Sequence, residues 1–246
     1  MLRFADIFTY ENLLFMLKGA GLSLFIATTT LTIGLVLGTL IAGIRVGKNT
    51  LLKIVATGYV EVVRGTPMLL QITIFYLALP YLYKVLSGNY LPVDPLVMGI
   101  IAIGLNSAAY LSEVIRAAIN SIDKGQFEAA HAVGMSHRQT MFSIVLPQTI
   151  RNILPATGNE FVVNIKDTAV LNVISLNELF FASKSILGTT IKVYQTYLIT
   201  CAIYLVLTFT TTRILRLIEK KLRGPDSYII LGSRDKRRQD MGLEVK

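Results

Sequence analysis

Long apolar runs alternate with short charged segments along most of the chain. Residues 19–44 and 193–212 contain no charged side chain, and both reach the roughly 20 residues that a helix needs to cross the hydrocarbon core of a bilayer. Residues 65–83 and 95–112 are slightly shorter, and each extends through polar flanks that can face protein or water. The pattern predicts four membrane-spanning helices.

A fifth apolar run, residues 153–174, is interrupted by Glu160, Lys166 and Asp167. We count it as a span, because charged side chains at membrane depth are tolerated where they face protein or a water-filled path. The 246 residues are 53% hydrophobic and only 16% charged, which is too apolar for an ordinary soluble domain and too short for several domains. The chain is therefore predicted to be an all-α membrane protein with five transmembrane helices.

The basic residues set the predicted topology. They gather in alternate loops, at Arg45, Lys48, Lys53, Arg116, Lys124, Arg138 and Arg151 and after Arg213, whereas the opposite loops hold mainly Lys84, Lys184 and Lys192. The positive-inside rule places the N-terminus outside and the C-terminus in the cytoplasm. The net charge of +9 follows from this topology, and no basic stripe with interleaved aromatic residues favours nucleic-acid binding.

The two ends of the chain differ from the spans. Residues 1–18 alternate apolar and charged positions at helical spacing, which predicts an interfacial N-terminal segment. Residues 224–246 combine Gly, Pro and mixed charge, which predicts a flexible cytoplasmic tail. The transmembrane domain is expected over residues 19–223. His131 and His137 are too few to form a metal site, so no metal is predicted.

Gly34 and Gly38 form a small-xxx-small pair in the first span. Such pairs allow two helices to pack closely in lipid. Ordinary tolerance of glycine in membrane helices explains the pair equally well, and the sequence leaves both interpretations open.

The loop over residues 119–150 carries an apolar helical face on the cytoplasmic side. Phe127, Ala130, Gly134, Met141 and Val145 recur at intervals of three, four or seven residues. A face of this kind docks into a groove of a partner. A glycine within it permits a turn between two short helices.

Three parts of this loop together form a motif: Glu128-Ala129-Ala130, then Gly134, then Ile144 to Pro147. The motif resembles the EAA loop of permeases from ATP-binding-cassette (ABC) importers, and its spacing matches throughout. The resemblance implies the type I ABC importer permease fold, in which a cytoplasmic coupling helix contacts an ATPase. It assigns coupling to Glu128, Ala129, Ala130, Gly134 and Pro147.

Other segments resemble the polar amino acid branch of these permeases, which imports substrates such as His, Glu, Gln, Arg and cystine. They are Glu61 to Pro67 with Gln71, Leu105 to Tyr110 with Glu113 and Arg116, and Lys166 to Ala169. Pro67 is expected to kink its helix. One departure is Ala169-Val170-Leu171, where the branch has Ser-Leu-Ala, so any hydroxyl role at Ala169 is vacant.

Glu160, Asn164 and Asp167 lie at positions i, i+4 and i+7, so one face of the fifth run is polar. This stripe is predicted to line the pore, with Asn106, Tyr110 and Glu113 on another helix facing it. The predicted substrate path comprises Asn106, Glu160, Asn164, Lys166, Asp167 and Thr168. An acidic residue is expected to meet the ammonium of an amino acid, and Lys166, Asn106 or backbone amides its carboxylate. Internal pairing of Lys166 with Asp167 is the open alternative.

The resemblance also implies partners. No phosphate-binding loop occurs, since residues 43–49 have the wrong glycine spacing, so the chain is not itself an enzyme and ATP with Mg²⁺ belongs on a partner. The expected partners are two ATPase subunits, a second permease that is identical or homologous, and an extracytoplasmic amino-acid-binding protein. The expected location is the bacterial inner (plasma) membrane.

Three alternatives remain at this point. The same architecture fits methionine, an opine or another small solute. An ion-driven secondary transporter would use Glu160 and Asp167 as carriers, but it leaves the loop motif unexplained and lacks paired repeats. A membrane scaffold needs no buried glutamate.

Overall fold

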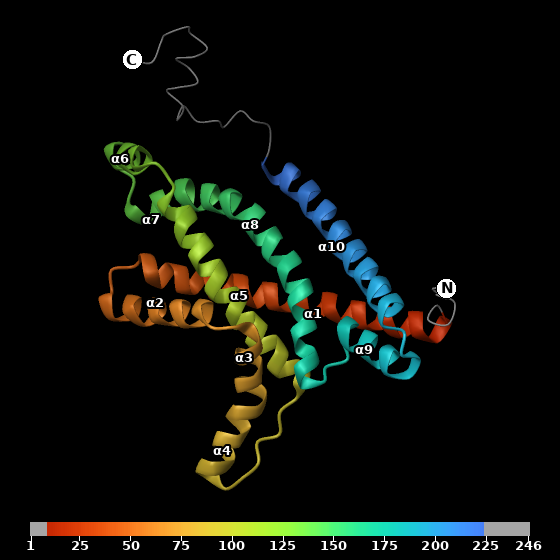
Figure 1. Ribbon diagram of the computed structural model, residues 1–246. Coiled ribbons are helices and arrows are strands. Elements are labelled where there is room, and N and C mark those ends of the chain that lie inside the picture. Colours follow the sequence, from red (N-terminus) through yellow and green to blue (C-terminus); the bar gives the residue numbers. More distant parts are fainter. Residues whose placement is uncertain (1–8, 224–246) are drawn as a thin grey trace, which may run out of the picture.

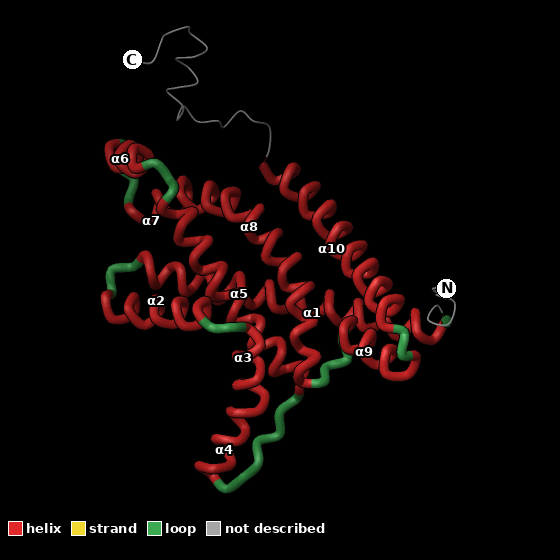
Figure 2. The backbone as a smooth tube through the Cα atoms, in the orientation of Figure 1, coloured by secondary structure: helices red, strands yellow, loops and turns green. Residues whose placement is uncertain are grey.

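A computed structural model describes residues 9–223, and in this part of the chain every regular element is a helix (Figures 1 and 2). The predicted tail over residues 224–246 and most of the segment before Tyr10 lie outside the described residues. The α-helices are α1 (Tyr10–Val46), α2 (Thr50–Gly65), α3 (Met68–Thr73), α4 (Leu79–Ser87), α5 (Pro95–Asn120), α6 (Lys124–Ala132), α7 (His137–Thr140), α8 (Leu146–Asp167), α9 (Leu179–Thr190) and α10 (Val193–Arg223). Two π-helical turns, η1 (Ile74–Ala78) and η2 (Met141–Val145), and one 3₁₀ turn, η3 (Thr168–Ile174), connect some of them.

Four helical stretches are long and apolar enough to cross a membrane: Tyr10–Val46, Met68–Ser87, Pro95–Asn120 and Val193–Leu222. A fifth consists of two pieces, His137–Ile174 and Leu179–Thr190, which meet at an angle of 51°. The prediction of an all-α membrane protein is confirmed, and the bent pair is the run that the charged residues interrupt.

The first helix is longer than its apolar run. Residues 10–18, predicted as part of an interfacial segment, continue into the first span without a break, and Thr9 caps the helix by accepting a hydrogen bond from the Asn12 amide at 3.2 Å. Whether this end lies at the membrane surface stays a prediction.

Proline determines where several helices change form. Pro80 and Pro147 each lie in the first turn of an α-helix that directly follows a π-helical turn. A proline has no backbone N–H and blocks the regular hydrogen-bond ladder, so the preceding turn widens. At Pro67 the chain is extended, with φ −64° and ψ 136°, and separates α2 from α3. The predicted kink is a complete break.

Helices α1 and α5 form the closest pair in the bundle. A Cβ built at Gly34 would lie 2.7 Å from the Cβ of Ser107, and one at Gly38 would lie 3.1 Å from the carbonyl oxygen of Ala108. These distances are shorter than ordinary van der Waals contact, so only glycine allows this approach. The close-packing interpretation of the Gly34 and Gly38 pair is therefore confirmed.

Two apolar clusters join the remaining helices. One, formed by Met16, Ala20, Leu179, Ala182, Ile186 and Ile199, fixes α9 between α1 and α10. The other joins α1, α3, α5 and η3 through Ile26, Ile72, Ala102, Ile103, Leu171, Ile174 and Leu176. In Figure 1 the α6–α7 segment and the C-terminal end of α10 lie at one end of the bundle, and α9 lies at the other with the N-terminal end of α1.

Candidate substrate path and coupling loop

A buried polar cluster connects three helices at the predicted path. The Ser107 hydroxyl on α5 donates to Glu160 Oε1 on α8 at 2.7 Å and accepts from Asn164 Nδ2 at 2.8 Å. Asn164 Nδ2 also lies 3.4 Å from Thr30 Oγ1 on α1. Ser107, Asn164 and Thr30 are almost completely buried, and Glu160 is 5% exposed. The structure therefore brings Glu160 and Asn164 together, and it adds Ser107, which the sequence analysis missed.

Asn106 lies on a different face of α5 from Ser107. Its Nδ2 donates to Gln71 Oε1 on α3 at 3.3 Å, and its side chain is half-buried. Successive residues of a helix point about 100° apart, so Ser107, and not Asn106, meets the polar stripe of α8. Asn106 instead connects α5 to the start of the second span.

The last three predicted path residues follow Asn164 at the end of α8. Lys166 is exposed and Asp167 is half-buried. Thr168 is buried and its hydroxyl donates to the Ile165 carbonyl at 2.8 Å. In residues 9–223 no salt bridge joins Lys166 to Asp167. Ala169, where the sequence departs from the family pattern, is the second residue of η3.

Glu113 belongs to a separate ionic cluster. It accepts from Arg45 on α1 at 2.5 Å and pairs with Arg116 one turn further along α5. The side chain of Arg45 is 9% exposed, so this contact ties the ends of α1 and α5 together. Glu113, which was expected to face the polar stripe of α8, instead forms ion pairs with Arg45 and with Arg116.

A second buried glutamate, Glu178, lies just before α9. Its carboxylate accepts from the backbone N–H groups of Phe180 at 2.9 Å and Phe181 at 2.7 Å, which is the geometry of a helix N-cap. Tyr204 on α10 donates to it at 3.1 Å and Ser23 on α1 at 3.4 Å. This residue was not among the predicted functional positions. The available signal was an acidic residue between apolar segments, directly before a helix.

The coupling loop is a helix-turn-helix. Helix α6 ends in a turn where Gly134 has φ +83°, and the Met135 N–H donates back to the Ala130 carbonyl at 2.9 Å. This arrangement is a Schellman C-cap. Ser136 and Gln139 then form a reciprocal capping box that starts α7. The predicted turn at Gly134 is confirmed.

Most of the predicted coupling residues lie on the surface. Glu128, Ala129, Gly134 and Pro147 are exposed, and Ala130 is buried at 2%. An open hollow of about 420 Å³ lies beside them, lined by Asp123, Gly125, Gln126, Ala129, Ala130, Val133, Met135 and Ile144. The loop therefore offers a small apolar contact surface at one end of the bundle.

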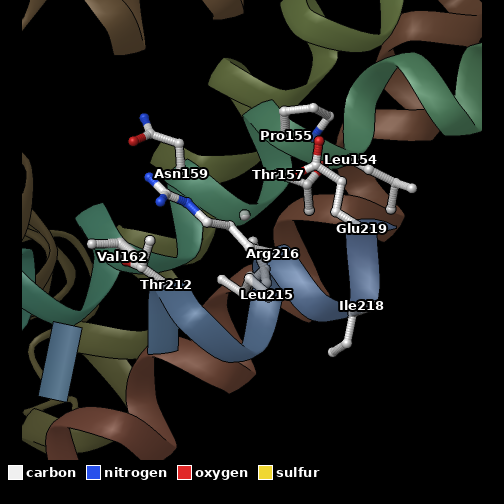
Figure 3. Close-up of a pocket in the computed structure, with 12 residues that line it drawn as sticks. Leu154, Pro155, Thr157, Asn159, Val162, Thr212, Leu215, Arg216, Ile218 and Glu219 are labelled. Carbon is white, nitrogen blue, oxygen red and sulfur yellow. The ribbon is translucent and has the colours of Figure 1, made fainter. Parts of the chain in front are cut away.

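A further cleft of about 340 Å³ lies between α8 and α10 (Figure 3). Its walls are mainly apolar, and its polar members are Thr157, Asn159, Thr212, Arg216 and Glu219. None of the predicted path residues lines it. Helix α8 therefore presents one face to this cleft and another to the buried cluster around Glu160.

These features define a class of protein: a helical membrane permease with polar groups inside the bundle and an exposed loop that carries the predicted coupling motif. The chain belongs to the family of binding-protein-dependent transport system inner membrane components, whose model matches residues 34–224. It is thus a permease subunit of an ABC transporter, as the loop motif predicts. The ion-driven and scaffold alternatives are set aside.

Relatives cover nearly the whole chain. A putative glutamine transport system permease protein GlnP of Rickettsia typhi is 37% identical over 213 residues, which is 87% of this chain and 95% of the relative. The glutamine transport system permease protein GlnP of Escherichia coli K12 is 33% identical over 208 residues, covering 85% and 93%.

Solved structures agree on the fold. An amino acid ABC transporter crystallised with histidines has a chain that is 35% identical, with a TM-score of 0.81 over 90% of this chain and 99% of that one. The inward-facing MetNI methionine transporter gives a TM-score of 0.62 at 18% identity and supports the fold alone. The predicted type I ABC importer permease fold is confirmed.

Proposed function

We propose that this chain forms the membrane path of an ATP-driven importer for a polar amino acid, with glutamine as the first candidate. The observation that carries the proposal is the identity of 37% over 95% of a relative named as a glutamine permease. The solved amino acid ABC transporter that is 35% identical to this chain supports the same branch over the methionine or opine alternative.

Glu160 is the proposed partner of the substrate ammonium. Among the described side chains, only Ser107 donates a hydrogen bond to its carboxylate, at Oε1. The carboxylate therefore keeps acceptor capacity for a ligand. Asp167 lies about two turns further along the same polar side of α8, and Lys166 lies beside it, about a third of a turn off that side; together they supply charge of both signs. An amino acid zwitterion needs both signs within a short distance.

The energy source is proposed to lie on other subunits. Two ATPase subunits that bind ATP and Mg²⁺ would hold the coupling loops of two permeases, identical or homologous, while an extracytoplasmic protein delivers the amino acid. Support comes from the family's dependence on a binding protein and from the exposed loop around Glu128 and Gly134. Closure of the ATPases would move these loops as rigid units and alternate access to the path.

The proposed location is the bacterial inner membrane with the N-terminus outside. Figure 1 supports this orientation, because the loop with the coupling motif and the basic end of α10 lie at the same end of the bundle. Reporter fusions that are active on only one side of the membrane test it. Activity of an extracytoplasmic reporter after Arg223 would contradict it.

Uptake by proteoliposomes tests the proposed substrate. The chain is reconstituted with its ATPase and binding protein into vesicles that contain ATP. Radiolabelled glutamine is then added outside the vesicles. We expect ATP-dependent uptake that other polar amino acids inhibit more strongly than methionine. Uptake of methionine alone would overturn the substrate proposal and keep the architecture.

Coupling is tested at Gly134. We expect Gly134→Trp to insert normally but to separate ATP hydrolysis from uptake, because it forces a bulky residue into a left-handed turn on the docking surface. Asparagine tolerates this backbone conformation, so Gly134→Asn is the matched control and should keep most of the uptake per ATP. Co-purification of the ATPase is measured alongside, and normal uptake by the Trp variant would refute the coupling assignment.

A further inference from the structure

The break between α2 and α3 leaves a carbonyl without its helical donor. In a continuous helix the Val63 carbonyl would accept from the N–H of residue 67, but that residue is Pro67 and has no N–H. Unpaired backbone groups inside a membrane protein are strongly unfavourable. Some other donor must therefore satisfy this carbonyl.

Gln71 supplies the missing donor from one turn into the second span. Its Nε2 lies 2.7 Å from the Val63 carbonyl oxygen and 3.0 Å from that of Thr66. It also lies 2.9 Å from Thr66 Oγ1, a hydroxyl that donates in turn to the Val62 carbonyl at 2.9 Å. The side-chain amide of Gln71 therefore takes the place of the backbone N–H that proline lacks.

These contacts fix the direction of the next hydrogen bond. Carbonyl oxygens only accept, so the NH₂ end of Gln71 must face the break and its Oε1 must face α5. Oε1 can only accept as well, and its partner at 3.3 Å is therefore the amide nitrogen of Asn106. With this nitrogen held, the Asn106 carbonyl oxygen points away from Gln71 as a free acceptor among the described residues.

We propose that Gln71 is a positioning residue with two linked effects: it holds the α2–α3 break, and it orients Asn106 so that its carbonyl oxygen accepts from an N–H group of the substrate. This inference rests on the proposed function, since it assigns the donor side of the amino acid, its ammonium or side-chain amide, to Asn106. Substrates without an N–H donor at that position gain nothing from this contact.

Transport kinetics test the orientation of Asn106. We expect Gln71→Leu to raise the KM for glutamine about tenfold, as for one lost hydrogen bond to a charged group, with a smaller change in kcat. Gln71→Glu separates the two effects: its carboxylate still accepts from Asn106 and should keep KM close to the wild-type value, although it repels the carbonyls of the break. Thr73→Val is the control: it removes the bond from Thr73 Oγ1 to the Leu69 carbonyl, which a helical N–H already satisfies, and should leave KM unchanged. An unchanged KM in Gln71→Leu would overturn the proposal.

Hydrogen exchange of the assembled transporter tests the break without any substrate. Gln71→Leu should speed amide exchange over residues 62–72, and adding Pro67→Ala should slow it again, because the new N–H can donate to Val63. The double variant should keep the raised KM, since Asn106 is still unanchored. Unchanged exchange in Gln71→Leu would refute the role at the break. If the wild type imports no polar amino acid while exchange behaves as expected, the proposed function fails and only the role at the break stands.

Discussion

The two buried glutamates, Glu160 and Glu178, differ in what satisfies their carboxylates. Glu178 accepts from two backbone N–H groups, Tyr204 and Ser23. Glu160 accepts from Ser107 alone among the described side chains. Both lie in the bundle at 5% exposure or less.

A carboxylate surrounded by four donors has little acceptor capacity left, so Glu178 serves to join α1, α9 and α10. A carboxylate with one donor is incomplete, and burial makes the missing partner costly. The number of fixed donors therefore separates a structural acid from one that is open to a ligand, even when burial is the same.

The largest effect is expected at Glu178. Replacing it with alanine leaves the N–H groups of Phe180 and Phe181 and the Tyr204 hydroxyl without their acceptor, and we expect a loss of about 3 kcal/mol in stability. The thermal unfolding midpoint and the yield of purified complex measure it. Glu178→Asp keeps a carboxylate N-cap and should recover part of the loss. A stable Glu178→Ala variant with normal yield would remove the contrast between the two acids.

The next effect concerns transport, not stability. Glu160→Gln keeps an oxygen that accepts from Ser107 but loses the charge, so we expect uptake to fall about tenfold to a hundredfold with little change in the unfolding midpoint. Uptake and unfolding are measured on the same preparation. If the variant imports normally, Glu160 is structural like Glu178.

The smallest effect is expected at Ser107. Ser107→Ala removes the donor to Glu160 and the acceptor of Asn164, and about 1 kcal/mol is typical for such a loss. We expect uptake to fall only about threefold, because the charge of Glu160 remains. A fall as large as that of Glu160→Gln would mean that Ser107 contacts the substrate directly.

The parts of the molecule that the sequence predicts are those set by local pattern. Apolar run lengths predict four of the spans, Gly134 predicts the turn of the loop, and the spacing of Glu128, Gly134 and Pro147 carries the family resemblance that implies its coupling role. In each case the physical cause lies within a few residues: the thickness of the bilayer, or a backbone conformation that glycine adopts freely.

The missed features depend on how helices turn toward one another. Asn106 and Ser107 are adjacent polar residues, and the rotation of α5 about its axis decides which of them meets Glu160. The close contact of α5 with Gly34 fixes that rotation. The N-cap at Glu178 also escaped notice, because α9 was not expected as a separate helix. Helix α2 was missed for a different reason. Its apolar positions are mixed with Lys53, Glu61 and Arg64, so it has no long apolar run.

The contact between α1 and α5 has a consequence for mutational scans of this chain. Gly34 carries no functional group, yet any side chain there would push against Ser107, and through it against Glu160 and Asn164. Substitutions at Gly34 should therefore score as severely as those in the path itself. A map of sensitive positions will therefore include both the residues that pack this helix pair and those that line the substrate path. Only assays that measure folding and uptake separately will distinguish the two groups.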